Sequence, residues 1–110
     1  MNSAQRIAQL EDWAKEDPKD PFPPYGIAME HRSSGNIEEA INHLQRITTT
    51  FPKYLPAFQL LGIIYLELEK LEDAEEIFTL AKQLAFEQKD HKALGEINGF
   101  IMQIQTQQYD

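Results

Sequence analysis

Residues 58–81 read FQLLGIIYLELEKLEDAEEIFTLA, and the spacing of their apolar residues indicates how this part of the chain folds. From Ala57 to Leu68 the apolar positions nearly encircle a helix, which indicates that neighbours cover it on more than one side. From Leu71 to Ala85 they narrow to a stripe with i, i+3, i+4 spacing. Only Glu69 and Lys70 separate the two segments. The stretch therefore predicts an antiparallel helical hairpin.

A second hairpin with the same spacing lies upstream. Its turn at residues 33–36 precedes an apolar stripe from Ile37 to Ile47, which Phe51-Pro52 ends. The two hairpins correspond at a fixed interval of 34 positions. The corresponding pairs are Ile27 and Leu61, Ala28 and Gly62, His31 and Tyr65, Ala40 and Ala74, Leu44 and Phe78, and Ile47 and Ala81. A shared offset of this kind indicates an internal repeat.

The downstream hairpin resembles a tetratricopeptide repeat, a helix pair with this period and residue order. The residues that carry the resemblance are Leu61, Gly62, Tyr65, Ala74, Phe78 and Ala81. Phe58 stands where the family pattern prefers tryptophan, and Phe86 replaces the usual proline.

The upstream hairpin follows the family pattern less closely. It matches at Ala28, Ala40 and Pro52. It departs at the tryptophan, tyrosine and phenylalanine positions, which are Pro24, His31 and Leu44.

The repeat frame, extended in both directions, divides the whole chain. Residues 1–18 resemble the second helix of a preceding repeat, with Trp13 expected in the core. Residues 19–54 and 55–88 form two repeats like those of the family, residues 89–106 a C-terminal capping helix, and residues 107–110 a frayed tail. The predicted fold is all-α: a right-handed α-solenoid of antiparallel helix pairs with about six helices.

The small residues of the motif have a physical role. Two helices approach closely only where one of them presents small side chains, and the space beside the contact must then be filled. Gly62 and Ala74 are therefore expected where the paired helices come closest. Tyr65 and Phe78 are expected to fill the space beside them.

The composition restricts the function class. The chain has 110 residues, no cysteine and a net charge of −8, so disulfides and thiolate metal sites are excluded, and nucleic acid is not an expected partner. No apolar run approaches the roughly 20 residues that span a membrane. Residues 1–17 lack the order of a secretory signal. These features predict a cytoplasmic protein, although a precursor whose leader had been removed would look the same.

The resemblance implies protein binding through the first helix of each pair. The residues it places on the inner surface are Phe22, Tyr25, Met29, Arg32, Ser33, Gln59, Ile63, Leu66 and Glu67. Among them, an apolar groove edged by Arg32 and Glu67 would be formed by Tyr25, Met29, Ile63 and Leu66. Such a groove suits a helical or extended peptide of a partner protein.

Other interpretations remain open at this point. In one alternative, the helix at residues 93–104 of the same chain covers the groove. In another, a second copy of the chain covers it, and the role is then structural homo-oligomerisation. A third interpretation is a regulatory piece of an enzyme whose catalytic partner is encoded separately. Binding of a terminal carboxylate is not expected, because the family members that clamp one use basic and amide residues where this chain has Tyr25, Met29 and Leu60.

No motif in the sequence predicts catalysis or a bound cofactor. His31 is expected at a packing position, His43 on an outward face and His91 near a turn, and none has H-E-x-x-H spacing. The acidic run at residues 69–76 lacks the alternating pattern of a calcium loop. The sequence therefore predicts no catalytic residue, no cofactor and no metal ligand.

Overall fold

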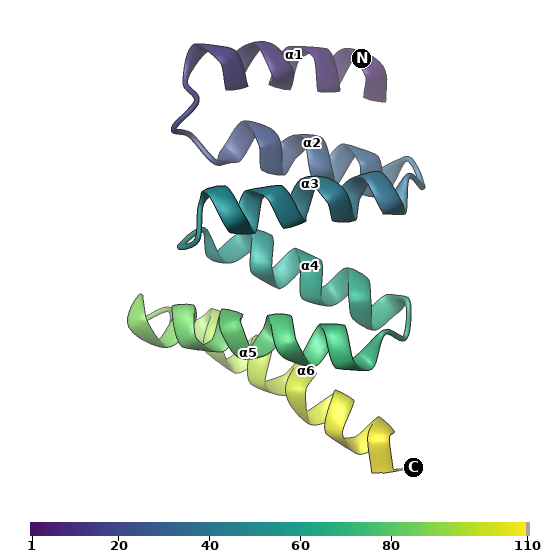
Figure 1. The fold of residues 1–110 in the computed structure, drawn as a ribbon, viewed down its shortest axis with the longest axis vertical. Coiled ribbons are helices and arrows are strands. Elements are labelled where there is room, and N and C mark those ends of the chain that lie inside the picture. Colours follow the sequence, from purple (N-terminus) through teal and green to yellow (C-terminus); the bar gives the residue numbers. More distant parts are fainter. Residues whose placement is uncertain (110) are drawn as a thin grey trace. The chain divides into compact units, whose positions relative to one another are not determined.

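The computed structural model describes residues 1–109 and has six helices in that range (Figure 1). Their bounds are α1 Ser3–Glu16, α2 Phe22–Ser33, α3 Ile37–Thr50, α4 Leu55–Glu67, α5 Leu71–Glu87 and α6 His91–Tyr109. The described part of the chain contains no strand. The predicted all-α helical repeat fold is confirmed.

The chain forms two compact units, one of residues 1–54 and one that begins at Leu55. In the N-terminal unit, α2 packs against both α1 and α3. Helix α3 is strongly amphipathic and buries the same side that the sequence stripe predicts. The buried apolar residues of this unit are Leu10, Ile27, Ala28, Ala40, Leu44 and Ile47.

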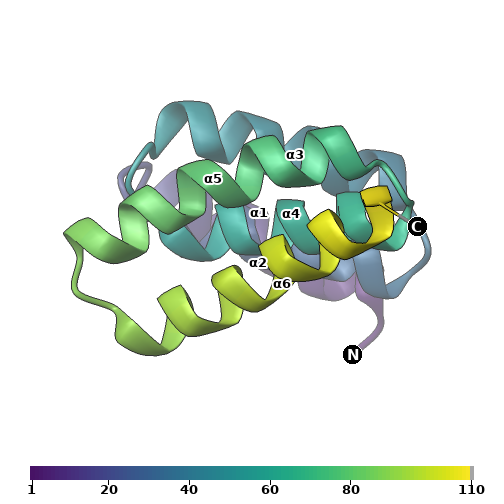
Figure 2. The same ribbon diagram turned by 90° about the horizontal axis from the view of Figure 1, so that it is seen from below.

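In the C-terminal unit, α5 packs against both α4 and α6 (Figure 2). Tyr65 and Phe78 are both buried, and no part of the Phe78 side chain is exposed. The ring of Phe78 stacks on Phe100 of α6, with 5.0 Å between the ring centroids. The prediction that these two aromatic residues fill the hairpin is confirmed.

The close approach of α4 and α5 requires a glycine at position 62. A Cβ atom there would lie 2.7 Å from the ring atoms Cε1 and Cζ of Phe78, well inside van der Waals contact. The corresponding residues of the N-terminal unit are Ala28 and Leu44, and both are fully buried. The upstream pair thus has alanine where the downstream pair has the smaller glycine, and it has leucine where the downstream pair has the larger phenylalanine.

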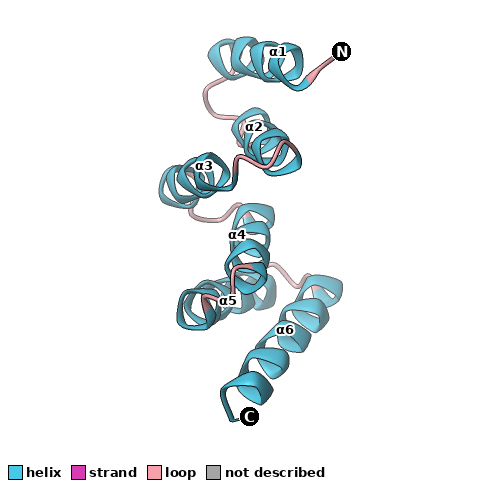
Figure 3. Cartoon of the chain, turned by 90° about the vertical axis from the view of Figure 1, so that its right-hand side faces the viewer, coloured by secondary structure: helices cyan, strands magenta, loops and turns pink. Residues whose placement is uncertain are grey.

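Three of the turns, which Figure 3 draws as pink loops between helices, share one backbone geometry, although only one of them contains glycine. Gly35, Glu69 and Lys89 have left-handed backbones, with φ of 81°, 59° and 58°. In each turn the next residue donates its N–H to the carbonyl five positions back, which is the Schellman motif. These bonds are Asn36 to His31 at 2.8 Å, Lys70 to Tyr65 at 2.9 Å and Asp90 to Ala85 at 2.9 Å.

Trp13 does not lie in the core, contrary to expectation. Its side chain is 46% exposed, and Leu10 is the only buried residue of α1. Within its unit α1 packs on α2, so only one side of α1 is covered. Trp13 lies beside that contact and lines a shallow apolar pocket with Leu10 and Phe22.

The last helix is longer than the capping helix expected at residues 89–106. Helix α6 includes residues 107–109, which were expected to be frayed, and Asp110 lies outside the described residues. Thr106 donates its hydroxyl hydrogen to the carbonyl of Met102 at 3.0 Å within this last part of the helix. Glutamine, which makes up most of this segment, is also a good helix former.

Candidate partner-binding surfaces

The seven residues predicted to bind a partner lie on two helices. Helix α2 carries Tyr25, Met29 and Arg32, which we call the α2 face. Helix α4 carries Gln59, Ile63, Leu66 and Glu67, which we call the α4 face. Glu67 is exposed, the other six are half-buried and none is buried. Spacings of three and four residues place each set on one side of its helix.

The α2 face combines an aromatic ring, a thioether and a guanidinium group. The rings of Tyr25 and Tyr54 meet edge to face, with 5.5 Å between centroids. Burial raises the pKa of Tyr25, while the charge of Arg32 acts in the opposite direction. Burial also raises the pKa of Tyr54. Both phenols are therefore neutral near pH 7 and able to donate a hydrogen bond.

The α4 face is the accessible side of an otherwise buried helix. Eight of the thirteen residues of α4 are buried, whereas Ile63 and Leu66 keep part of their surface exposed. Helix α6 packs on α5 and leaves this part accessible. The C-terminal unit thus exposes aliphatic side chains next to the carboxylate of Glu67.

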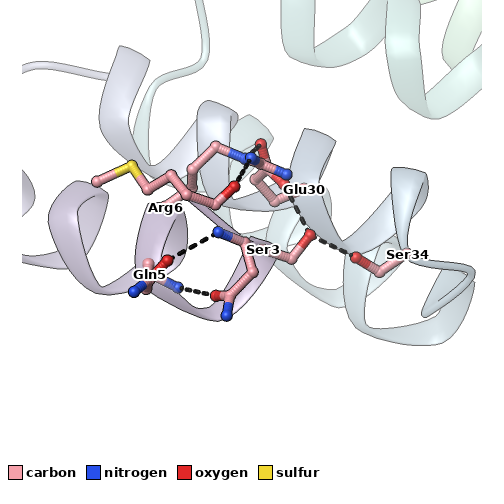
Figure 4. Close-up of polar contacts among 7 residues, drawn as sticks. Ser3, Gln5, Arg6, Glu30 and Ser34 are labelled. Carbon is pink, nitrogen blue, oxygen red and sulfur yellow. Dashed lines mark hydrogen bonds and ion pairs between the residues drawn. The ribbon is translucent and has the colours of Figure 1, made fainter.

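A group of polar contacts connects α1 with α2 and with the residue that follows it (Figure 4). Arg6 Nε lies 2.7 Å from Glu30 Oε1, and Ser3 Oγ donates to Glu30 Oε2 at 3.0 Å. The hydroxyl oxygens of Ser3 and Ser34 are 2.8 Å apart. The hydrogen bond from Arg6 is the main reason that the pKa of Glu30 is lowered. These contacts could not be predicted from the sequence, because the partners are 24 to 31 residues apart.

We expect the contribution of Glu30 to stability to depend on pH. Because its pKa is lower in the folded chain than in the unfolded one, the stabilisation is fully present above about pH 4.5 and is lost as the pH falls through the folded pKa. Thermal unfolding of the native chain and of Glu30→Gln should differ near neutral pH and converge in acid. Glu76→Gln, which alters an exposed carboxylate of α5, is the control. A difference that stays constant across this range would contradict the prediction.

Two of the three histidines lie together, which the sequence did not predict. His31 of α2 and His43 of α3 stack with ring centroids 5.1 Å apart and an interplanar angle of 16°. His43 is thus half-buried, not simply outward-facing. Burial lowers the pKa of His43, and the charges of Arg46 and His31 act in the same direction. His91 is exposed at the start of α6.

A sequence profile described as "Tetratricopeptide repeat" matches residues 31–95. The chain belongs to the tetratricopeptide repeat family. This match covers the second half of the upstream hairpin and all of the downstream one, where the motif residues are buried in the structure. None of the curated proteins compared with the chain matches it.

Several solved structures have a similar fold. A tetratricopeptide repeat domain protein from Salinibacter ruber is 28% identical in its solution structure, with a TM-score of 0.74 over 80% of this chain and 89% of that one. Its crystal structure gives 27% identity and a TM-score of 0.74, over 78% and 97%. PcrH, in complex with the chaperone-binding region of PopD, is 17% identical, with a TM-score of 0.81 over 93% and 77%.

None of the helices within residues 1–109 has both the length and the apolar character needed to cross a membrane.

Proposed function

We propose that this chain is a non-catalytic adaptor that binds a peptide or protein partner through the α2 face and the α4 face. The observation that carries the proposal is the partial exposure of Ile63 and Leu66 on a helix that is mostly buried. Aliphatic groups of this kind gain free energy when a partner removes them from water. The polar groups of Gln59 and Glu67 beside them supply hydrogen-bonding specificity.

The family and the structural relatives support this proposal at a general level. Tetratricopeptide repeat domains are protein–protein interaction modules, and PcrH holds a region of another protein in its complex. By analogy, the partner of this chain is a segment with apolar side chains at helical or extended spacing. That both faces contribute to one groove stays a prediction.

Replacing Ile63 with glutamate is expected to weaken partner binding by about tenfold or more, because the charge would have to be buried against apolar atoms of the partner. Partners are recovered from an extract of the source organism with the native chain as bait. The affinity of each purified partner for native and variant chains is then measured by calorimetry.

The matched control is Leu80→Glu, which makes the same change at a half-exposed leucine of α5, outside both faces. Circular dichroism establishes that both variants are folded. Partners that bind the Ile63→Glu and Leu80→Glu variants equally well would show that the α4 face is not the binding surface.

The main competing function is homo-oligomerisation through the same two faces. Light scattering distinguishes the two functions, since the adaptor is a monomer with accessible faces. A dimer that dissociates on Met29→Glu or Ile63→Glu would replace the adaptor with an assembly role.

A further inference from the structure

Three potential metal ligands meet within the N-terminal unit. His31 comes from α2, while Glu39 and His43 are four residues apart on α3 and so lie on the same side of that helix. Each offers one ligand atom, and these atoms all lie within 4.8 Å of one another. The hairpin turn at residues 33–36 brings the two helices together at this place.

Both imidazoles have the capacity to bind a cation. His31 Nδ1 is buried and has no hydrogen-bond partner within the described part of the chain. His43 Nδ1 lies 3.0 Å from Arg46 Nη2, and because a guanidinium only donates, this nitrogen carries a lone pair.

We propose that His31, Glu39 and His43 bind one divalent transition-metal ion of the zinc type. Two imidazoles and one carboxylate suit borderline ions such as zinc, whereas calcium and magnesium prefer oxygen ligands throughout. Three protein ligands leave at least one coordination position for water or for a group of a partner protein. The site is independent of the α2 and α4 faces proposed above.

The charges around the cluster both assist and oppose a cation. The carboxylates of Glu39 and Glu11, the latter on α1, interact electrostatically with His43 and attract a positive ion. Arg46 opposes it, because its guanidinium occupies the lone pair of His43. Arg46 is exposed, so its side chain is free to rotate away when the metal takes its place.

Only a small rearrangement separates the cluster from a coordinated geometry. Ligand atoms bound to one tetrahedral zinc lie about 3.3 Å apart, given bond lengths near 2.0–2.1 Å. Side-chain rotations that bring the three atoms together by at most about 1.5 Å suffice, and Glu39 is exposed and able to move.

The test is a zinc titration of the untagged chain, followed by calorimetry and by NMR of the histidine side chains. The chain has three histidines and no cysteine, so His91 serves as an internal control. We expect one zinc ion per chain, with resonance shifts at His31 and His43 and none at His91. Absence of saturable binding, or equal shifts at all three histidines, would overturn the proposal.

Variants identify the ligands independently of the spectra. Glu39→Gln and His43→Gln should each weaken zinc binding by about tenfold or more, and each should reduce the zinc-dependent rise in melting temperature that binding to the native state produces. His91→Gln should change neither, while Arg46→Ala should strengthen binding. Affinities that are unaffected by Glu39→Gln and His43→Gln would place the ion elsewhere and refute the assignment.

Discussion

Replacing Phe78 with alanine is expected to lower the free energy of unfolding by about 3–5 kcal/mol. The side chain is fully buried, it stacks on Phe100, and its ring touches the backbone of α4 at Gly62. The substitution therefore removes contacts among all three helices of the C-terminal unit. Because a domain of this size has only about 5–15 kcal/mol of stability, urea unfolding should detect the loss easily.

The control for this prediction is Phe86→Ala. Phe86 is on the same helix but is 71% exposed, so its truncation should change stability by about 0.5 kcal/mol or less. Equal effects of the two substitutions would mean that Phe78 does not hold the three helices together.

Replacing Gly62 with alanine is expected to destabilise the chain by about 1–3 kcal/mol, because the added methyl group overlaps the ring of Phe78. This ring has no room to move aside, since it is buried and stacked on Phe100. In an open helical site the same substitution would instead stabilise by about 1 kcal/mol. Whether Gly62→Ala lowers or raises the stability therefore indicates whether α4 and α5 are in close contact at this position.

Gly99→Ala supplies the matched comparison. Gly99 is in the middle of α6, and a Cβ there would meet nothing within 4 Å. We expect Gly99→Ala to raise the melting temperature and Gly62→Ala to lower it. A stabilising effect of Gly62→Ala would mean that α4 and α5 are not in close contact at this point.

Much of the fold could be predicted because it follows from local spacing. The narrow apolar stripe beginning at Leu71 and the two-residue turn specify a hairpin, and the interval of 34 residues then locates its counterpart upstream. The turn at Glu69 was found in this way although it contains no glycine to mark it. The burial of Tyr65 and Phe78 followed from the need to fill space beside small residues.

Features that depend on contacts between distant residues could not be predicted. Trp13 has helical spacing with Ile7 and Leu10, but the pattern does not say how much of α1 is covered. The stacking of His31 on His43 depends on the rotation of α2 and α3 about their axes. The position of Glu39 one turn before His43 was a usable signal, yet it becomes meaningful only once His31 is known to lie beside them.

The candidate partner-binding surfaces could be predicted only in part. Their positions came from the resemblance to the family, and the structure leaves Ile63 and Leu66 partly accessible, as a binding surface requires. Which partner they contact depends on side chains of another molecule, about which the spacing within one chain carries no information.

The pairing of Gly62 with Phe78 restricts the order in which duplicated hairpins diverge. Ala28 and Leu44 occupy the corresponding positions upstream and are fully buried. A mutational path from the upstream pair to the downstream pair is easiest when alanine is first exchanged for glycine, at a cost of about 1 kcal/mol in helix propensity. The enlargement Leu44→Phe taken first would overpack the contact by about 1–3 kcal/mol. The two positions are therefore expected to change together as tandem copies diverge in sequence. The substitution to a smaller residue at one position comes before the substitution to a larger residue at the other.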